Sequence, residues 1–173
     1  IPQLKSAVTK TVLATDMGQH FELVAKFGTT LADLCPDHED YEKRVNTHLH
    51  LVLQMAMKVA DLGHCASRWA THLYWCKCLE EEFFAQGDLE RDAGMPPSPL
   101  MDRSAPGCMS PTNQVSFYRY IAMPLFAKLS KAFPGTLELM CQADANFRQW
   151  KALEAQAELE ESEPPSQSLE QYK

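Results

Sequence analysis

The sequence has no long hydrophobic run, few basic residues and no recognisable leader, and each absence argues against a class of protein. No apolar run reaches the roughly 18 residues that a membrane-spanning helix needs, and no secretory signal is visible. Lys and Arg number 16 against 23 Asp and Glu, a net charge of −7 that argues against binding to nucleic acid or an anionic membrane. A phosphate-containing substrate remains possible, because a divalent metal inverts the local field.

Compact catalytic and metal-binding motifs are also missing. The sequence has no nucleotide-binding glycine loop, no serine nucleophile elbow and no clustered metal motif. His48 and His50 are a poor helical metal pair, and Cys76 and Cys78 would point about 200° apart on a helix, too far to share one metal. We expect free thiols in a reducing, cytoplasmic compartment; the six cysteines are Cys35, Cys65, Cys76, Cys78, Cys108 and Cys141.

Apolar residues recur at helical spacing along most of the chain, and no segment alternates with the period of a strand. The fold class we predict is therefore all-α, a helical bundle. Gly63 and the pair Pro134-Gly135 should end helices, the first helix should end before Pro36, and Gln86-Gly87-Asp88 could interrupt the third. The proline-rich stretch 94–111 is too long for a simple connector, which suggests a functional loop. The expected helices span residues 8–31, 41–61, 67–86, 112–131 and 136–158.

Local patterns single out candidate site residues, each with an ordinary structural interpretation beside the functional one. Asp61 ends an apolar helix, where it is either a salt-bridged or capping acid or a ligand to a hard divalent cation. Gln114 and Phe117 share a helix face and could read a purine edge and clamp its ring, or be a capping Gln and a core Phe. Leu79 and Phe83 have ordinary core spacing. The run Glu80–Glu82 is typical of a solvated face.

Several strings, taken in order, resemble the class I cyclic-nucleotide phosphodiesterases from about residue 10 to Trp150. The most specific combination is Glu81-Glu-Phe-Phe-Ala-Gln-Gly-Asp88 followed by Asn113-Gln-Val-Ser-Phe117. The other strings are Thr11-Val-Leu-Ala-Thr-Asp-Met17, Val59-Ala-Asp-Leu62, Gly94-Met95, Ser98-Pro99 and Met101-Asp102.

The resemblance implies an all-helical catalytic domain of the HD type that hydrolyses 3′,5′-cyclic nucleotides, cAMP or cGMP or both, to 5′-monophosphates. It implies two divalent metal ions, zinc and magnesium or manganese, that hold the phosphate and activate a bridging water. A His would act as general acid toward the O3′ leaving group. The implied partner is the cyclic nucleotide substrate, without nucleic acid or a membrane span, and a homodimer of the parent protein stays open.

Position by position, the resemblance implies a role for each candidate. Asp61 matches a metal-ligand Asp, Gln114 the purine-selective glutamine and Phe117 the hydrophobic clamp. Leu79 and Phe83 fall on the wall of the nucleotide pocket, and His64 falls beside the base. The resemblance also places Glu82 in the supporting shell and the loop around Pro99, Leu100 and Met101 over the pocket.

Two motifs of the resembled family are missing. The strings His-Asn-x-x-His-Ala, which carries the general acid, and His-Asp-x-x-His, which supplies metal ligands, should both precede Thr11, and only ten residues do. We therefore expect a partial catalytic domain over residues 1–158, an acidic disordered tail over 159–173, and no catalytic residue in this chain. Because the chain begins with Ile1, we expect it to start inside a longer protein and to be inactive alone. The alternative is a helical interaction or regulatory module without catalysis.

Overall fold

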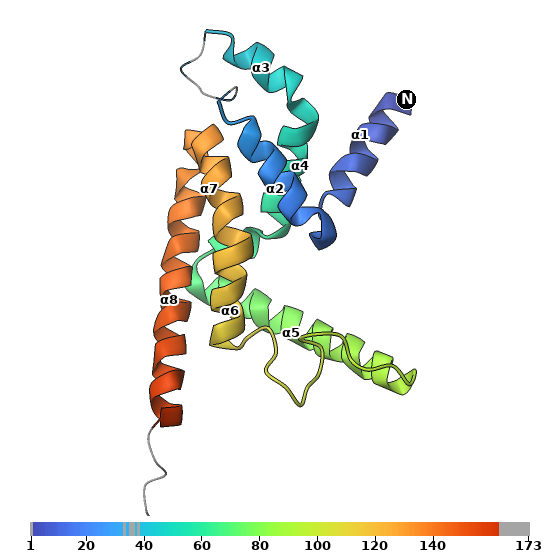
Figure 1. The fold of residues 1–173 in the computed structure, drawn as a ribbon, viewed down its shortest axis with the longest axis vertical. Coiled ribbons are helices and arrows are strands. Elements are labelled where there is room, and N and C mark those ends of the chain that lie inside the picture. Colours follow the sequence, from blue (N-terminus) through green and yellow to red (C-terminus); the bar gives the residue numbers. More distant parts are fainter. Residues whose placement is uncertain (1, 33, 35–36, 38, 163–173) are drawn as a thin grey trace, which may run out of the picture.

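The computed structural model describes residues 2–32, 34, 37 and 39–162, and within these ranges every regular element is a helix (Figure 1). The prediction of an all-α fold is confirmed. Cys35, Pro36 and the segment 163–173 of the expected tail lie outside the described residues. None of the helices in the described part is long and apolar enough to span a bilayer.

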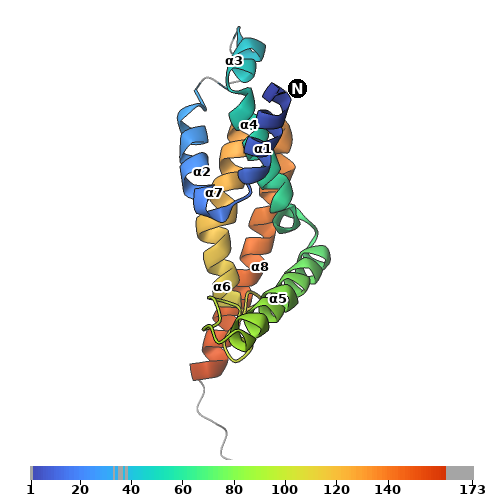
Figure 2. The same cartoon turned by 90° about the vertical axis from the view of Figure 1, so that its right-hand side faces the viewer.

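The helices divide into a long central pair, a covering layer and a projecting arm. The central pair is α8 beside the nearly continuous run of α6 and α7 (Figures 1 and 2). Helices α2 and α4 pack on α7, and α1 packs on α4. Helix α5 leaves the bundle as an arm that carries the loop 93–110 along it. The bounds are α1 Pro2–Leu13, α2 His20–Thr29, α3 Tyr41–Thr47, α4 Leu49–Asp61, α5 Trp69–Asp92, α6 Pro111–Phe117, α7 Met123–Ala132 and α8 Leu137–Ser162.

Short helical turns join these elements. A 3-10 turn, η1 (Met17–Gln19), separates α1 from α2, and η2 (Gly63–Ala66) follows α4. A π-helical turn, η3 (Tyr118–Ala122), joins α6 to α7 just before Pro124, whose missing N–H cannot serve a regular α-helical ladder. The 3-10 turn η4 (Pro134–Thr136) precedes α8.

Several of the expected helix boundaries are wrong. The helix expected over 8–31 breaks at residues 14–16, where the Asp16 carboxylate accepts a hydrogen bond from the Gly18 N–H at 2.8 Å and caps η1. The helix expected over 41–61 breaks at His48, which caps both α3 and α4. Helix α8 runs to Ser162, so residues 159–162 are helical although we expected them in the tail.

The expected interruption at Gln86-Gly87-Asp88 does not occur, and α5 continues to Asp92. Gly87 is buried beneath the loop, and a Cβ at this position would overlap the Met101 carbonyl oxygen. The glycine therefore allows a close approach of two backbones and does not end a helix.

One apolar core joins α2, α4, η2, α5, α6, η3, α7 and α8. Five polar side chains of the described residues are buried with it: His20, Lys58, His72, Gln114 and Asn146. Lys58 donates to the Ala14 carbonyl at 2.8 Å, which ties α4 to the end of α1. His20 is fully buried, and neither of its ring nitrogens has a hydrogen-bond partner. Burial, followed by the nearby charge of Lys58, lowers the pKa of His20, so the ring is held neutral in the folded protein.

Candidate functional site

A cavity of about 270 Å³ lies where the end of α4, η2, α5, α6 and the loop 93–110 meet. Its lining is almost entirely apolar, with a few polar groups at defined positions. The structure brings together every residue that the sequence singled out for metal or substrate binding: Asp61, His64, Leu79, Phe83, Gln114 and Phe117. Met17, Leu62, Leu100, Cys108 and Asn113 complete the lining.

The amide of Gln114 has one defined orientation. Its Nε2 donates to the backbone carbonyl of Cys108 at 2.7 Å, and an amide oxygen could not serve there because the carbonyl only accepts. The Gln114 Oε1 atom is therefore the free end, and it is buried without a hydrogen-bond partner. Such an atom carries an unmet desolvation cost, which a ligand donor in the cavity would relieve.

The polar end of the cavity contains Asp61 and His64. Asp61 is exposed at the last residue of α4, so it escapes the desolvation expected of an acid in an apolar stripe. His64 is partly buried, and burial lowers its pKa while the Asp61 charge acts in the opposite direction. A neutral imidazole beside an exposed carboxylate therefore forms this end of the cavity.

The loop 93–110 is held against α5 by side chains on both elements. Arg103 donates to Asp88 at 2.8 Å and to Glu81 at 3.2 Å, and its guanidinium lies 5.1 Å from the centre of the Phe84 ring. The Glu80 carboxylate accepts from the Met109 N–H at 2.9 Å. The run of acidic residues is thus more than a solvated face, since two of its members hold the loop.

The loop residues expected over the pocket have different positions. Leu100 lines the cavity and has a positive φ of 68°, a conformation that costs a non-glycine residue about 1–2 kcal/mol. Pro99 and Met101 are not among the lining residues. Glu82, expected in the supporting shell, is exposed and also outside the lining, because the α5 face that carries it turns away from the cavity.

Sequence reasoning missed His72, Cys108 and Trp150. His72 lies behind His64, and their Nδ1 atoms are 3.2 Å apart. Trp150 donates to His72 Nε2 at 2.8 Å from 78 positions further along the chain. Nothing in the local sequence marks these residues, because their role depends on contacts between elements that are distant in sequence.

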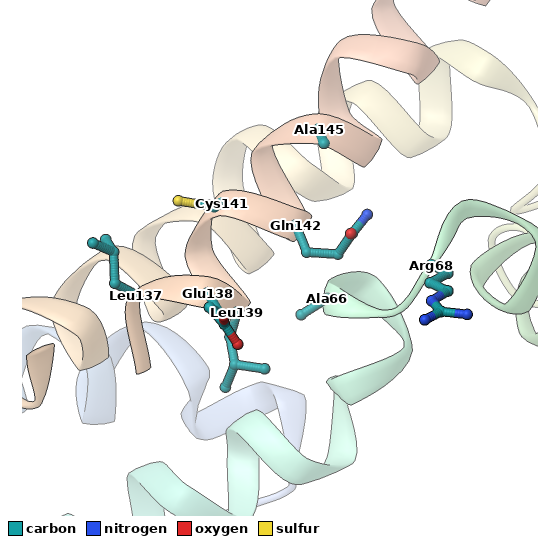
Figure 3. A pocket seen from close by; sticks show the side chains of 8 residues that line it. All are labelled: Ala66, Arg68, Leu137, Glu138, Leu139, Cys141, Gln142 and Ala145. Carbon is teal, nitrogen blue, oxygen red and sulfur yellow. The ribbon is translucent and has the colours of Figure 1, made fainter. Parts of the chain in front are cut away.

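A larger hollow of about 580 Å³ lies between η2 and the first turns of α8 (Figure 3). In Figure 3 Gln142 projects from α8 above Ala66, while Arg68 stands at the far end. It contains none of the residues singled out from the sequence, and its charged groups, Arg68 and Glu138, are exposed. The smaller cavity therefore has the more specific chemistry.

All five cysteines in the described part of the chain are unpaired, as expected for free thiols. Burial raises the pKa of Cys65 and Cys76 to about 12 and that of Cys108 to about 11. These thiols are therefore protonated near neutral pH and are poor nucleophiles.

Comparisons with known proteins agree with the sequence motifs. Residues 2–143 match the family model described as 3′5′-cyclic nucleotide phosphodiesterase. A Plasmodium falciparum protein named dual 3′,5′-cyclic-AMP and -GMP phosphodiesterase beta is 36% identical over 130 residues, 73% of this chain and 11% of that protein. The human dual specificity calcium/calmodulin-dependent 3′,5′-cyclic nucleotide phosphodiesterase 1B is 31% identical over 167 residues, 94% of this chain and 29% of that protein.

A solved structure shares the fold. The phosphodiesterase domain of Salpingoeca rosetta rhodopsin phosphodiesterase matches with a TM-score of 0.77 and 25% sequence identity. The match covers 92% of this chain and 48% of that domain. The chain thus spans about half of the solved domain, and at most 29% of the length of the two curated relatives named above.

Proposed function

Because the chain belongs to the 3′5′-cyclic nucleotide phosphodiesterase family, we propose that its cavity binds the purine end of a cyclic nucleotide, cAMP or cGMP. In this proposal the complete parent enzyme hydrolyses the nucleotide to its 5′-monophosphate, and the chain alone binds it without hydrolysis. The observation that carries the proposal is the buried, unpartnered Oε1 of Gln114, in a cavity that is also lined by Phe83 and Phe117.

The chemistry of the cavity suits a flat base with polar edges. Aromatic side chains provide faces for stacking, and the Gln114 oxygen accepts an N–H from the base edge. Adenine and guanine both carry such donors, so this contact serves either nucleotide. The volume of about 270 Å³ lies below the roughly 300–1,000 Å³ of pockets that enclose drug-sized ligands. It therefore suits the base better than the whole nucleotide.

The two metal ions of the family do not fit the residues that line the cavity. Among the residues that line the cavity, Asp61 is the only carboxylate and His64 the only histidine. A two-metal centre needs several carboxylate and imidazole ligands to coordinate both cations. Asp61 is in our proposal one ligand of that centre in the parent enzyme, and we derive no catalytic step from this chain.

Nucleotide binding can be tested on the 173-residue chain itself. We expect cAMP or cGMP to shift the amide NMR signals of cavity residues, while cyclic CMP, which has a smaller pyrimidine base, binds more weakly. Gln114→Ala should weaken binding about tenfold, the loss of one hydrogen bond of about 1.4 kcal/mol. Gln149→Ala, at an exposed amide on α8, is the matched control. Equal binding of cyclic CMP and cAMP, or no effect of Gln114→Ala, would contradict the proposal.

The catalytic half of the proposal needs the parent enzyme. We expect Asp61→Ala to reduce hydrolysis of both nucleotides at least tenfold, about 1.4 kcal/mol of lost transition-state stabilisation. Asp92→Ala, which removes an exposed carboxylate at the last residue of α5, should leave hydrolysis unchanged. Normal activity of the Asp61→Ala enzyme would remove Asp61 from the metal centre.

A second candidate function is a helical interaction module without catalysis. It is favoured by large apolar side chains that stand exposed on α1, among them Leu4 at 68% and Val8 at 54%. Exposed apolar surface of this kind marks a face that another protein segment covers. A parent protein that binds cyclic nucleotides but hydrolyses neither would favour this candidate.

A further inference from the structure

His72 is a fully buried histidine behind the cavity, and its ring nitrogens lie near polar atoms of Trp150, Tyr118, His64 and Cys76. The Cys76 sulfur, 3.6 Å from Nδ1 and 3.5 Å from Nε2, is the weakest of these partners. Trp150 donates its indole N–H to His72 Nε2 at 2.8 Å. The Tyr118 hydroxyl is 3.3 Å from the same nitrogen, but it donates to the Cys65 carbonyl at 2.9 Å. Because an indole N–H can only donate, His72 Nε2 must accept.

The proton of His72 is therefore on Nδ1. Burial, followed by the neighbouring His64, lowers the pKa of His72 to about 4, so the ring is neutral near pH 7 and carries one proton. The His72 Nδ1 atom is 3.2 Å from His64 Nδ1, and the two ring planes lie within 8° of parallel. This arrangement suits an N–H···N hydrogen bond from His72 to His64.

The same reasoning then assigns the tautomer of His64. Its Nδ1 accepts from His72 and so carries no proton, which leaves the proton of the His64 ring on Nε2. The His64 Nε2 atom is 3.7 Å from the Cys65 sulfur, a weak acceptor, and His64 lines the cavity. Within the described part of the chain the Cys65 sulfur is the one acceptor for this N–H, so an oxygen or nitrogen acceptor of a ligand in the cavity that His64 lines would be a stronger partner.

A metal ion is the other candidate occupant of this cluster. Ligand atoms of His64, Cys65 and His72 lie within 4.8 Å of one another, close enough for a shared cation. A metal on Nδ1 of His72 would move the proton of that ring to Nε2. Two N–H groups would then face each other across the 2.8 Å between His72 and Trp150. The observed contact therefore favours a proton over a metal between the two imidazoles.

We propose that His72 is a positioning residue that holds His64 in the Nε2–H tautomer, so that His64 presents a hydrogen-bond donor to the cavity. The donor complements the acceptor of Gln114, and the two groups together select a ligand with an acceptor beside a donor. Which ligand this is rests on the proposed function, a purine nucleotide. The two hydrogen bonds from Trp150 to His72 and from His72 to His64, which we call the relay, do not rest on the proposed function. They form within the chain in the absence of any ligand.

The relay is tested by long-range ¹H–¹⁵N NMR of the histidine-labelled chain, which distinguishes the two imidazole tautomers. We expect the Nδ1–H form for His72 and the Nε2–H form for His64 at pH 7. His72→Gln should keep the His64 tautomer, because an amide can accept from Trp150 and donate to His64. His72→Phe should release His64 into a mixture of both forms.

The outcomes separate the relay from a purely structural role. An Nδ1–H form of His64 in the wild-type chain, or an unchanged Nε2–H form in the His72→Phe chain, would overturn the proposal. If His72→Phe does not fold, Trp150→Phe tests the same relay by removing the donor that holds the His72 proton on Nδ1. An unchanged His72 tautomer in that variant would equally overturn it. Zinc added to the wild-type chain should leave both tautomers unchanged, and loss of the His72 Nδ1–H signal would favour the metal.

A second measurement connects the relay to the ligand. We expect His72→Phe to weaken cyclic nucleotide binding about tenfold, the value of one hydrogen bond, and His72→Gln to restore most of it. Binding that is equal in the two variants, with the tautomers as expected, would show that the donor does not contact the nucleotide and would overturn that part of the proposal. Absence of any nucleotide binding to the wild-type chain would instead contradict the proposed function and leave the relay standing.

Discussion

The amide of Gln114 donates to the Cys108 carbonyl at 2.7 Å and leaves its own oxygen buried and unpaired. The bond links the first turn of α6 to the last residues of the loop 93–110, and a buried carbonyl of the loop thereby gains a donor. It also leaves the oxygen as the free end of the amide. One contact therefore contributes both to stability and to the polarity of the cavity.

Replacing the Gln114 amide with a carboxylate should remove the stabilisation that the bond to the Cys108 carbonyl provides. In Gln114→Glu an oxygen would face the Cys108 carbonyl, so both the bond and the satisfaction of the carbonyl are lost. We expect the free energy of unfolding to fall by about 1–3 kcal/mol at pH 7, measured as a shift of the urea midpoint. Gln149→Glu, at an exposed position, is the control. Equal midpoints for the two variants would show that the bond to Cys108 contributes nothing.

The close approach of α5 and the loop predicts a cost for any side chain at residue 87. In Gly87→Ala the new Cβ would overlap the Met101 carbonyl, so the loop must move away from α5. We expect faster hydrogen exchange at the Met101 amide, which donates to Ser98, and weaker nucleotide binding because Leu100 is displaced. Gly135→Ala, where a Cβ meets no atom within 4 Å, should change neither property. An unchanged rate of hydrogen exchange at the Met101 amide would mean that α5 moves to accommodate the new Cβ and that the loop does not.

Burial of the histidines predicts that the chain loses stability in mild acid. The folded pKa of His72 is about 4, against 6.5 for the free side chain, so the unfolded state binds more protons between these values. The stabilisation is complete above pH 6.5 and is lost as the pH falls toward 4. For this residue it amounts to at most about 3 kcal/mol. The lowered pKa values of His20 and His64 act in the same direction.

Urea midpoints measured between pH 7 and pH 4.5 check this dependence. We expect the His72→Gln variant to lose less stability than the wild type over this interval, because it removes the proton acceptor. His50→Gln, at an exposed position on α4, should follow the wild type. A wild-type midpoint that stays constant with pH would contradict the burial of neutral histidines.

The exposed apolar face predicts a broad unfolding transition for the isolated chain. Val12 and Leu13 of α1 are 53% and 55% exposed, and Phe21 leaves a further exposed apolar side chain on α2. Other apolar residues of α2 are buried in the core: Leu23, Val24 and Phe27. We expect weakly cooperative urea unfolding, in which signals from α1 change before those of α7 and α8. A single sharp transition in a monomer, coincident for all probes, would count against a partial domain.

The helical class was readable from the sequence, because apolar residues at steps of three and four lie on one face of a helix. This periodicity does not depend on how the helices pack together. The family was readable from the ordered strings around Phe83 and Gln114, and so were most of the residues that line the cavity, although Cys108 was not. Helix ends were less readable. Asp16 caps a break that the apolar spacing bridges, and Gly87 resembles a helix breaker although it serves a contact with Met101.

Only the tertiary structure decided how these residues are oriented and protonated. The orientation of Gln114 depends on the Cys108 carbonyl, and the tautomer of His64 depends on His72 and, through it, on Trp150, 78 positions further on from His72. Periodicity reports which face of a helix is apolar, but a hydrogen bond depends on where donors and acceptors from separate elements meet. That meeting is a consequence of packing α8 against η2, α6 and the start of α5, and no local pattern in the sequence contains it.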